Sequence, residues 1–313
     1  MRTSFKKRIK HWIGDLLLNG LLTLIVLLLL PLRPKALASL SKVLGVFSYH
    51  LLQKYRRRVL RNLSLAFGPE KDLKKRINMA KEIFVQFALT PLETVYAYSH
   101  SFNQFLRKIE IQGKEQLDQA LSQGRGVIAL GAHLGSFTLV GARLSLEGYR
   151  FNLIINEGNY PRLWRRLGKY QKRMGQNPFS IKPMISSLKR CLNSLRRNEI
   201  LYLVADEQRR DGGHPVPFFH HPAYTPMGPA LLSLKTGAPI LPMFILRKER
   251  LPHTLLIGPP VKIERTGEME KDLERLTIAF TKVIEERIRE VPTQWAWLNH
   301  RWKLPLRHLS PKR

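Results

Sequence analysis

The segment that most constrains this chain is a hydrophobic run that ends in a turn of small residues containing one histidine. Residues 126–130 read Gly-Val-Ile-Ala-Leu and predict a buried β-strand. Residues 131–141, Gly-Ala-His-Leu-Gly-Ser-Phe-Thr-Leu-Val-Gly, predict a tight turn that leads into a helix. His133 is therefore expected at the carboxyl end of a strand, which is where open α/β sheets bind their ligands.

Strands and helices alternate along the rest of the chain. Further strands are predicted at 106–112, 151–155, 200–205, 240–246 and 253–257, and helices at 69–100, 114–123, 136–147, 160–174, 184–197, 227–236 and 268–290. This alternation predicts an α/β fold with a single, largely parallel mixed sheet flanked by helices. Before the 227–236 helix, Thr225 is expected to be the N-cap and Pro226 the first helical residue, and Gly237 is expected to end that helix.

The charge balance indicates anionic partners. Lys and Arg number 53 against 23 Asp and Glu, a net charge of +30, which favours an anionic membrane surface, an acidic carrier protein or nucleic acid. Because no nucleic-acid-reading motif accompanies the charge, a nucleic-acid partner is not predicted. Cys191 has no cysteine to pair with, and His214, His220 and His221 lack the spacing of metal ligands, so neither a disulfide nor a metal or other cofactor is predicted.

The first 55 residues predict a membrane anchor and an interfacial helix. A basic start over residues 2–11 precedes an apolar run over 13–32, which is long enough to span a bilayer. No small-residue cleavage site follows the run, so an uncleaved anchor is favoured, with a buried core helix as the alternative. Residues 36–52 form an amphipathic segment suited to the plane of the membrane interface. Residues 56–305 then form the main domain, and residues 306–313 a basic tail.

Several sequence blocks, taken in their order and spacing, resemble the bacterial lipid A biosynthesis acyltransferases, the lauroyl and myristoyl transferases of the wider glycerolipid acyltransferase group. The similar blocks are residues 57–58, 61–63, 66–67, 132–139, 206–208, 212–213, 217–219, 222–223, 225, 237–239 and 292–303. The resemblance implies a membrane enzyme that moves a fatty acyl chain from an acyl carrier protein or coenzyme A thioester to a hydroxyl of a glycolipid such as lipid A. It also implies the bacterial inner membrane, with the catalytic domain on the cytoplasmic side.

The chain departs from the family pattern at two positions. Thr138 stands where the family carries the acidic residue of its His-x4-Asp/Glu block, and His220 stands where glycine is usual. A histidine that removes a proton from a hydroxyl normally depends on a carboxylate for its orientation and charge. The departure at Thr138 therefore leaves two alternatives: another group serves His133, or the chain is a catalytically impaired homologue that binds lipid or acyl carrier.

His133 is the predicted general base, with a structural histidine at a turn as the alternative. Thr138 is able to accept a hydrogen bond from the ring, but it supplies no charge. Asp206 and Glu207 follow one hydrophobic strand and Glu157 follows another, and these three are the candidate carboxylates, with Glu207 ranked first. The alternative for Glu207 is a surface ion pair with Arg209 or Arg210.

The remaining candidates are predicted to bind substrate. The amides of Gly135 and Ser136 are expected to stabilise a thioester oxyanion. A cluster of arginines after Asn159 is suited to phosphate, with a solvated helix face as the alternative. Gln208 completes the polar strand exit, and two aromatic residues are candidates for an acyl slot that the sequence does not distinguish from core. The arginines are Arg162, Arg165 and Arg166, and the aromatic residues are Phe218 and Phe219.

Overall fold

A seven-stranded sheet organises the described part of the computed structural model, which comprises residues 34–302 apart from 69, 100–101, 157–160, 209–212 and 249–252, together with residues 14, 16–21, 23–24 and 26–27. The strand order is β1-β9-β8-β2-β5-β3-β4. The strands are β1 (Glu110–Gln112), β2 (Val127–Gly131), β3 (Phe151–Ile155), β4 (Gln176–Ser180), β5 (Ile200–Val204), β8 (Ile240–Leu246) and β9 (Thr254–Ile257). All neighbours are parallel except β8 and β9. The predicted α/β fold with one mostly parallel sheet is confirmed.

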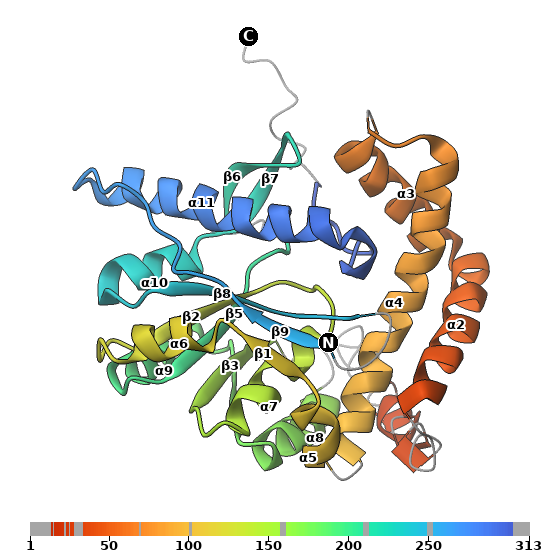
Figure 1. The fold of residues 1–313 in the computed structure, drawn as a ribbon, viewed down its shortest axis with the longest axis horizontal. Helices are drawn as coiled ribbons and strands as arrows, with labels where there is room; N and C mark the ends of the chain where they lie inside the picture. Colours follow the sequence, from red (N-terminus) through yellow and green to blue (C-terminus); the bar gives the residue numbers. More distant parts are fainter. Residues whose placement is uncertain are drawn as a thin grey trace, which may run out of the picture.

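Helices cover both faces of this sheet (Figure 1). In chain order, the described helices are α2 (Pro34–Leu51), α3 (Gln53–Phe67), α4 (Leu73–Ser99), α5 (Phe102–Arg107), α6 (Lys114–Leu121), α7 (Val140–Ser145), α8 (Pro161–Arg173), α9 (Met184–Arg196), α10 (Gly228–Thr236) and α11 (Met269–Glu290). Successive side chains of β2 point to opposite faces, and all of them are buried. Ile128 and Leu130 pack with α9, α10 and α11, while Val127 and Ala129 pack with α5, α6 and α7.

One helix beside the sheet matters for the site. Helix α4 contacts two short 3₁₀ segments, η1 (Phe137–Leu139) after β2 and η2 (Pro292–Gln294) after α11. Figure 1 shows α2 and α3 grouped with α4 on one side of the molecule, at the right of the view. Helix α4 therefore brings residues from before the sheet against the turn that follows β2.

Several sequence expectations about local structure were wrong. The strand predicted over 106–112 is helical up to Arg107 and becomes β1 only at Glu110, and the helix predicted over 136–147 begins with η1. Strand β4 was not predicted, and neither was the hairpin of β6 (Gly213–Phe218) and β7 (His221–Pro226). The prolines in both segments argued against strands there. A two-stranded ribbon nevertheless tolerates proline at positions whose backbone N–H is not needed for a hydrogen bond between the strands. Thr225 is not an N-cap: it lies fully buried in β7, where Arg301 donates to its Oγ1, and α10 begins at Gly228 after Met227. Gly237 ends α10 with a φ of 73°, as expected.

The N-terminal region contains the predicted amphipathic helix as α2. Residues 1–13, 15, 22, 25 and 28–33, on which much of the anchor prediction falls, lie outside the described residues, as does the 306–313 tail. Among the helices that are described, none has the length and apolar character needed to cross a membrane.

Candidate active site

The centre of the site is a histidine–carboxylate pair at the carboxyl ends of β2 and β5. These strands are parallel neighbours, with Gly131 paired with Val204, so the residues that follow them emerge side by side. Asp206 Oδ1 lies 2.9 Å from His133 Nδ1, and Asp206 Oδ2 accepts a hydrogen bond of 2.9 Å from the His133 backbone N–H. The same carboxylate therefore fixes both the main chain and the ring of His133.

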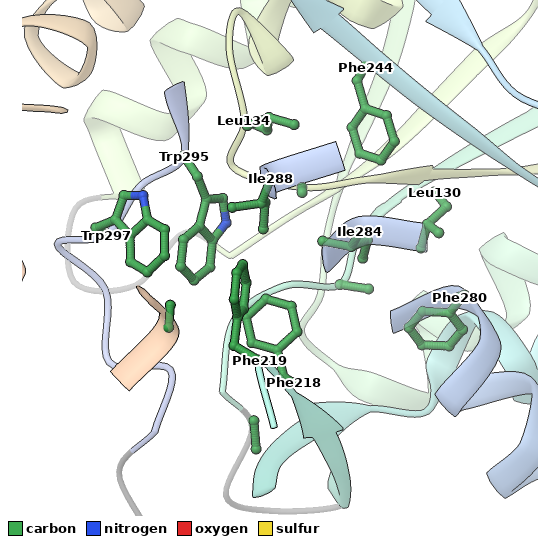
Figure 2. Packing of buried hydrophobic residues seen from close by; sticks show 14 of the residues in the cluster. Leu130, Leu134, Phe218, Phe219, Phe244, Phe280, Ile284, Ile288, Trp295 and Trp297 are labelled. Carbon is green, nitrogen blue, oxygen red and sulfur yellow. The ribbon is translucent and has the colours of Figure 1, made fainter. Parts of the chain in front are cut away.

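A tryptophan completes the surroundings of Asp206. Trp295 Nε1 donates to Asp206 Oδ2 over 2.6 Å, and the side chain of Asp206 is 1% exposed. Trp295 belongs to the buried aromatic cluster shown in Figure 2, which also holds Trp297, Phe218 and Phe219. Because an ionised carboxylate only accepts hydrogen bonds, the hydrogen of a neutral His133 ring is on Nδ1, and Nε2 is left with its lone pair.

The electrostatics of the pair favour a charged ring. Burial lowers the pKa of His133, but the charge and hydrogen bond of Asp206, with a smaller contribution from Glu207, outweigh it and raise the pKa to about 9. Burial raises the pKa of Asp206, and the His133 ring and the Trp295 donor outweigh that effect and lower it. His133 is thus a stronger base than an isolated histidine.

The second ring nitrogen faces the other candidate carboxylate. His133 Nε2 lies 3.7 Å from Glu207 Oε1, which also accepts a hydrogen bond of 2.7 Å from Asn299 Nδ2. The side chain of Glu207 is 56% exposed, whereas that of His133 is 25% exposed. The direct hydrogen bond to the ring comes from buried Asp206, whereas Glu207, which the sequence ranked first, lies farther from the ring.

Thr138 does not contact the ring in the way considered from the sequence. Its Oγ1 lies 2.6 Å from Thr94 Oγ1 of α4. Residues 134–136 are irregular and η1 starts only at Phe137, so position 138 does not lie one α-helical turn beyond His133. Thr138 therefore anchors the turn to α4, and Asp206 takes the position beside Nδ1.

The two amides expected to bind an oxyanion are already used. Gly135 N donates to Gln294 O and Ser136 N donates to Ile245 O, each over 3.0 Å. Gly135 has a φ of 58°, and a Cβ at this position would lie 2.0 Å from Ile245 O. These residues therefore join the turn to β8 and η2, and their N–H groups, predicted to bind an oxyanion, are bonded to main-chain carbonyls in this structure.

The other residues predicted to bind substrate differ in their exposure and contacts. Glu157 and Asn159 lie outside the described residues, and Gln208 is half-buried in the segment that follows Asp206. Arg162 and Arg165 are exposed near the start of α8, while Arg166 donates to Asn19 O and Thr23 Oγ1 of the N-terminal segment. The two aromatic residues predicted for an acyl slot, Phe218 and Phe219, are fully buried in the core cluster (Figure 2).

The closing segment contributes residues that sequence reasoning did not assign to the site. Trp295 and Asn299 contact the two carboxylates, and the only sequence signal for them was their membership of the block at 292–303. Asn62 of α3 donates to the carbonyl groups of Trp297 and Asn299, over 2.8 and 3.1 Å. Residues of the early block thus hold the closing segment against the site.

Comparison with known proteins gives a consistent result. The family model for bacterial lipid A biosynthesis acyltransferases matches residues 2–304. The lipid A biosynthesis palmitoleoyltransferase of Escherichia coli (strain K12) is 26% identical over 272 residues, 85% of each chain. The lipid A biosynthesis lauroyltransferase of the same organism is 24% identical over 299 residues, 93% of this chain and 90% of its own. A phosphatidylinositol mannoside acyltransferase of Mycobacterium tuberculosis (strain ATCC 25618 / H37Rv) is 26% identical over 257 residues, 75% and 77% of the two chains.

Proposed function

The chain belongs to the bacterial lipid A biosynthesis acyltransferase family, and from that premise we propose that it is an active O-acyltransferase. In this proposal it moves a fatty acyl chain from an acyl carrier protein or coenzyme A thioester to a hydroxyl of a lipid A-like or other glycolipid. The single observation that carries the proposal is the pairing of His133 Nδ1 with the buried Asp206 carboxylate, at 2.9 Å. This pair supports an active enzyme over an impaired homologue, because Asp206 supplies the charge that Thr138 lacks.

The proposed reaction uses His133 as general base. The acceptor hydroxyl donates to Nε2, and the ring takes its proton as the hydroxyl oxygen attacks the thioester carbonyl carbon. The carbon–sulfur bond then breaks, and the proton on Nε2 passes to the departing sulfur, so that the products are an ester and a thiol. Asp206 holds Nδ1–H throughout and stabilises the imidazolium, as the carboxylate does in serine hydrolases.

The same geometry implies a dependence on pH. The base must be neutral to accept a proton, and the pKa of His133 is raised to about 9. The ring is therefore largely protonated at neutral pH, and the neutral fraction grows as the pH rises toward 9. We expect turnover to rise over this interval.

Membrane association is the second part of the proposal. Val43, Phe47 and Leu51 of α2 expose 67%, 63% and 63% of their surface. Exposure of these apolar side chains to water is unfavourable, and burying them in the acyl region of a membrane removes that exposure. On the next helix, exposed Lys54, Arg57 and Arg61 follow at helical spacing and suit anionic headgroups. The exposed Arg162 and Arg165 are proposed contacts for the phosphates of donor or acceptor.

A reconstituted assay tests the proposal. Purified protein in detergent micelles is given a lipid A precursor or a phosphatidylinositol mannoside, with acyl carrier protein or coenzyme A thioesters of several chain lengths, and the lipids are analysed by mass spectrometry. An increase of one acyl group that His133→Ala abolishes supports the proposal. Absence of product with every donor and acceptor pair, from folded protein, favours the lipid-binding homologue.

A further inference from the structure

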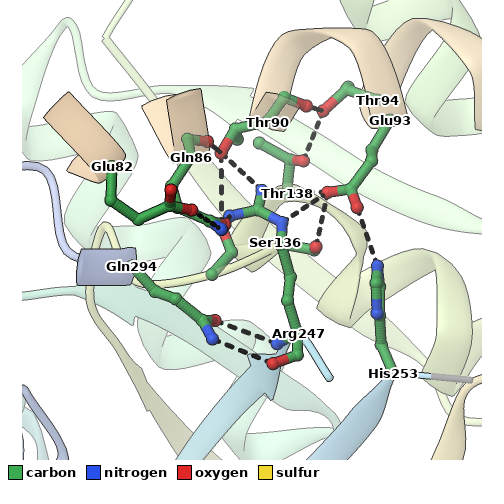
Figure 3. A network of polar contacts seen from close by, with 11 residues as sticks. Glu82, Gln86, Thr90, Glu93, Thr94, Ser136, Thr138, Arg247, His253 and Gln294 are labelled. Atoms are coloured by element: carbon green, nitrogen blue, oxygen red, sulfur yellow. Dashed lines mark hydrogen bonds and ion pairs between the residues drawn. The ribbon is translucent and has the colours of Figure 1, made fainter. Parts of the chain in front are cut away.

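A second buried carboxylate lies behind the turn that carries His133. Glu93 of α4 is 3% exposed, and it contacts Arg247 after β8 and His253 before β9 (Figure 3). Arg247 Nε donates to Glu93 Oε2 over 2.9 Å, and His253 Nε2 lies 2.7 Å from Oε1. Burial raises the pKa of Glu93, but these two partners outweigh it and hold the pKa at about 2, so the carboxylate is ionised.

The same carboxylate is bonded to the turn after β2. Ser136 Oγ donates to Glu93 Oε2 over 2.6 Å, in a fully buried contact. One helical position further along α4, Thr94 meets Thr138. Arg247 also donates to Thr90 Oγ1 over 2.7 Å. Side chains of α4 thus bond to both Ser136 and Thr138, which lie a few residues after His133 in the chain.

This buried cluster is separate from the proposed chemistry, yet it encloses one side of the catalytic turn. Burying Glu93 and Arg247 removes both charges from water, which is costly unless the geometry compensates fully. The four connected residues come from three parts of the chain that meet at this turn. Glu93 belongs to α4, Ser136 to the turn after β2, and Arg247 and His253 lie after β8 and before β9. On the other side of the turn, the groups that face His133 are Asp206 and Glu207, with the Phe137 ring 4.9 Å from the His133 ring.

We propose that Glu93 is a positioning residue for the acyl transfer reaction, acting through Ser136 to hold the His133 ring against Asp206. The inference rests on the proposed function. In this chain the acidic residue that the family pattern places at position 138 is absent. The Glu93 carboxylate of α4 bonds to the turn through Ser136, on the side away from Asp206. Glu93 does not reach the reacting atoms, so its effect on the reaction is entirely through the position of His133.

The test is the titration of the His133 ring, followed by NMR in protein labelled at histidine, with His133→Ala to identify its signals. Ser136→Ala removes the bond to the turn and leaves Glu93 with Arg247 and His253. A looser turn weakens the Asp206 contact, so we expect the pKa of His133 to fall by roughly half a unit or more. We expect kcat to fall about tenfold while KM stays within about twofold, because the ring is displaced from the attacking hydroxyl. Ser194→Ala, which removes another buried serine hydroxyl that bonds only within α9, is the matched control.

Glu93→Gln is the stronger variant and is expected to shift the titration further in the same direction. If that variant does not fold, Ser136→Ala alone decides the question. An unchanged His133 titration in Ser136→Ala, or the same change in Ser194→Ala, overturns the positioning role. The titration needs no turnover, so it separates the two proposals. If the wild-type protein transfers no acyl group but the variants show the expected titrations, the proposed function is refuted and the role of Glu93 in positioning His133 is supported.

Discussion

In the described part of the chain, two histidines face buried carboxylates, and the two pairs differ in what surrounds them. His133 and Asp206 are 2.9 Å apart, and His253 and Glu93 are 2.7 Å apart. The side chain of His133 is 25% exposed, whereas that of His253 is 7% exposed. In the first pair the second nitrogen faces Glu207 at 3.7 Å, and in the second pair Nδ1 has no hydrogen-bond partner among the described residues.

The carboxylates also differ in their other donors. Glu93 contacts a guanidinium, that of Arg247, which neutralises its charge directly. In the described part of the chain, the hydrogen bonds to Asp206 come from His133 and Trp295, so the His133 ring is the one group bonded to it that can become cationic. The difference teaches that contact with a carboxylate does not by itself mark a catalytic histidine. Buried Arg301 also interacts electrostatically with Asp206, but its hydrogen bonds go to Tyr224 O and Thr225 Oγ1. Access to solvent, and a carboxylate with no guanidinium hydrogen-bonded to it among the described residues, distinguish His133.

The largest expected effect separates the two histidines. His133→Gln removes the proposed base, and we expect turnover to fall by about 10³- to 10⁴-fold, at the upper end of what general base catalysis contributes. His253→Gln acts only through the buried cluster, and we expect turnover to fall by about tenfold at most. Transfer assays on both variants, with thermal unfolding as a check on folding, make the measurement. Equal losses in the two folded variants would remove the distinction between the pairs.

Asp206→Asn should have the next largest effect. The amide keeps the shape of the side chain but loses its charge, and we expect a loss in turnover of about 10³-fold by analogy with the serine hydrolase carboxylate. Because Asp206 raises the pKa of His133, the variant should also move the acid limb of the pH–rate profile from near pH 9 to lower pH.

Glu207→Gln is the matched control for Asp206→Asn, since it changes the adjacent carboxylate in the same way. Glu207 is mostly exposed and lies 3.7 Å from the ring, so we expect a change of less than about tenfold. A larger loss in Glu207→Gln than in Asp206→Asn would restore the order expected from the sequence.

Arg247→Met tests the buried pair through stability. The variant leaves Glu93 buried without its guanidinium, and we expect the free energy of unfolding to fall by about 3–5 kcal/mol in urea titrations. Since the pKa of Glu93 is lowered from 4.5 to about 2, this contribution is present above pH 4.5 and is lost as the pH falls toward 2. Lys248→Met is the control, because its exposed ion pair with Glu110 should contribute less than about 1 kcal/mol. A loss for Arg247→Met as small as that of Lys248→Met would contradict this account of the buried pair.

The sequence predicted one side of the His133 turn far better than the other. His133 and Asp206 each follow a hydrophobic run directly, and parallel strands bring such exits together at one edge of the sheet. The sequence did not rank Asp206 above Glu207, because neighbouring residues at a strand exit point in different directions and the direction depends on the partner strand.

The contacts between the His133 turn and α4 could not be predicted from any local sequence pattern. Glu93 sits within an amphipathic helical pattern, and its contact with Arg247 joins positions 154 residues apart. Thr138 was interpreted on the assumption that an α-helix follows the turn, whereas the structure has 3₁₀ geometry there. Helical spacing predicts which residues share a face, and it does not predict which distant side chain that face meets.

The smallest expected effect concerns position 138 itself. Thr94 donates to Thr90 O, so Thr138 is the donor in the 2.6 Å contact between the two hydroxyls. Thr138→Val removes this bond, and we expect a loss of about 1 kcal/mol in the free energy of unfolding, the usual net contribution of one hydrogen bond. Turnover should stay within about threefold of the wild type, because Asp206 rather than Thr138 bonds the ring. Thr94→Val removes this bond and also the bond from Thr94 to Thr90 O, so it should lower the free energy of unfolding further while turnover again stays within about threefold. A loss of turnover in Thr138→Val that approaches that of Asp206→Asn would instead place position 138 in the chemistry of His133.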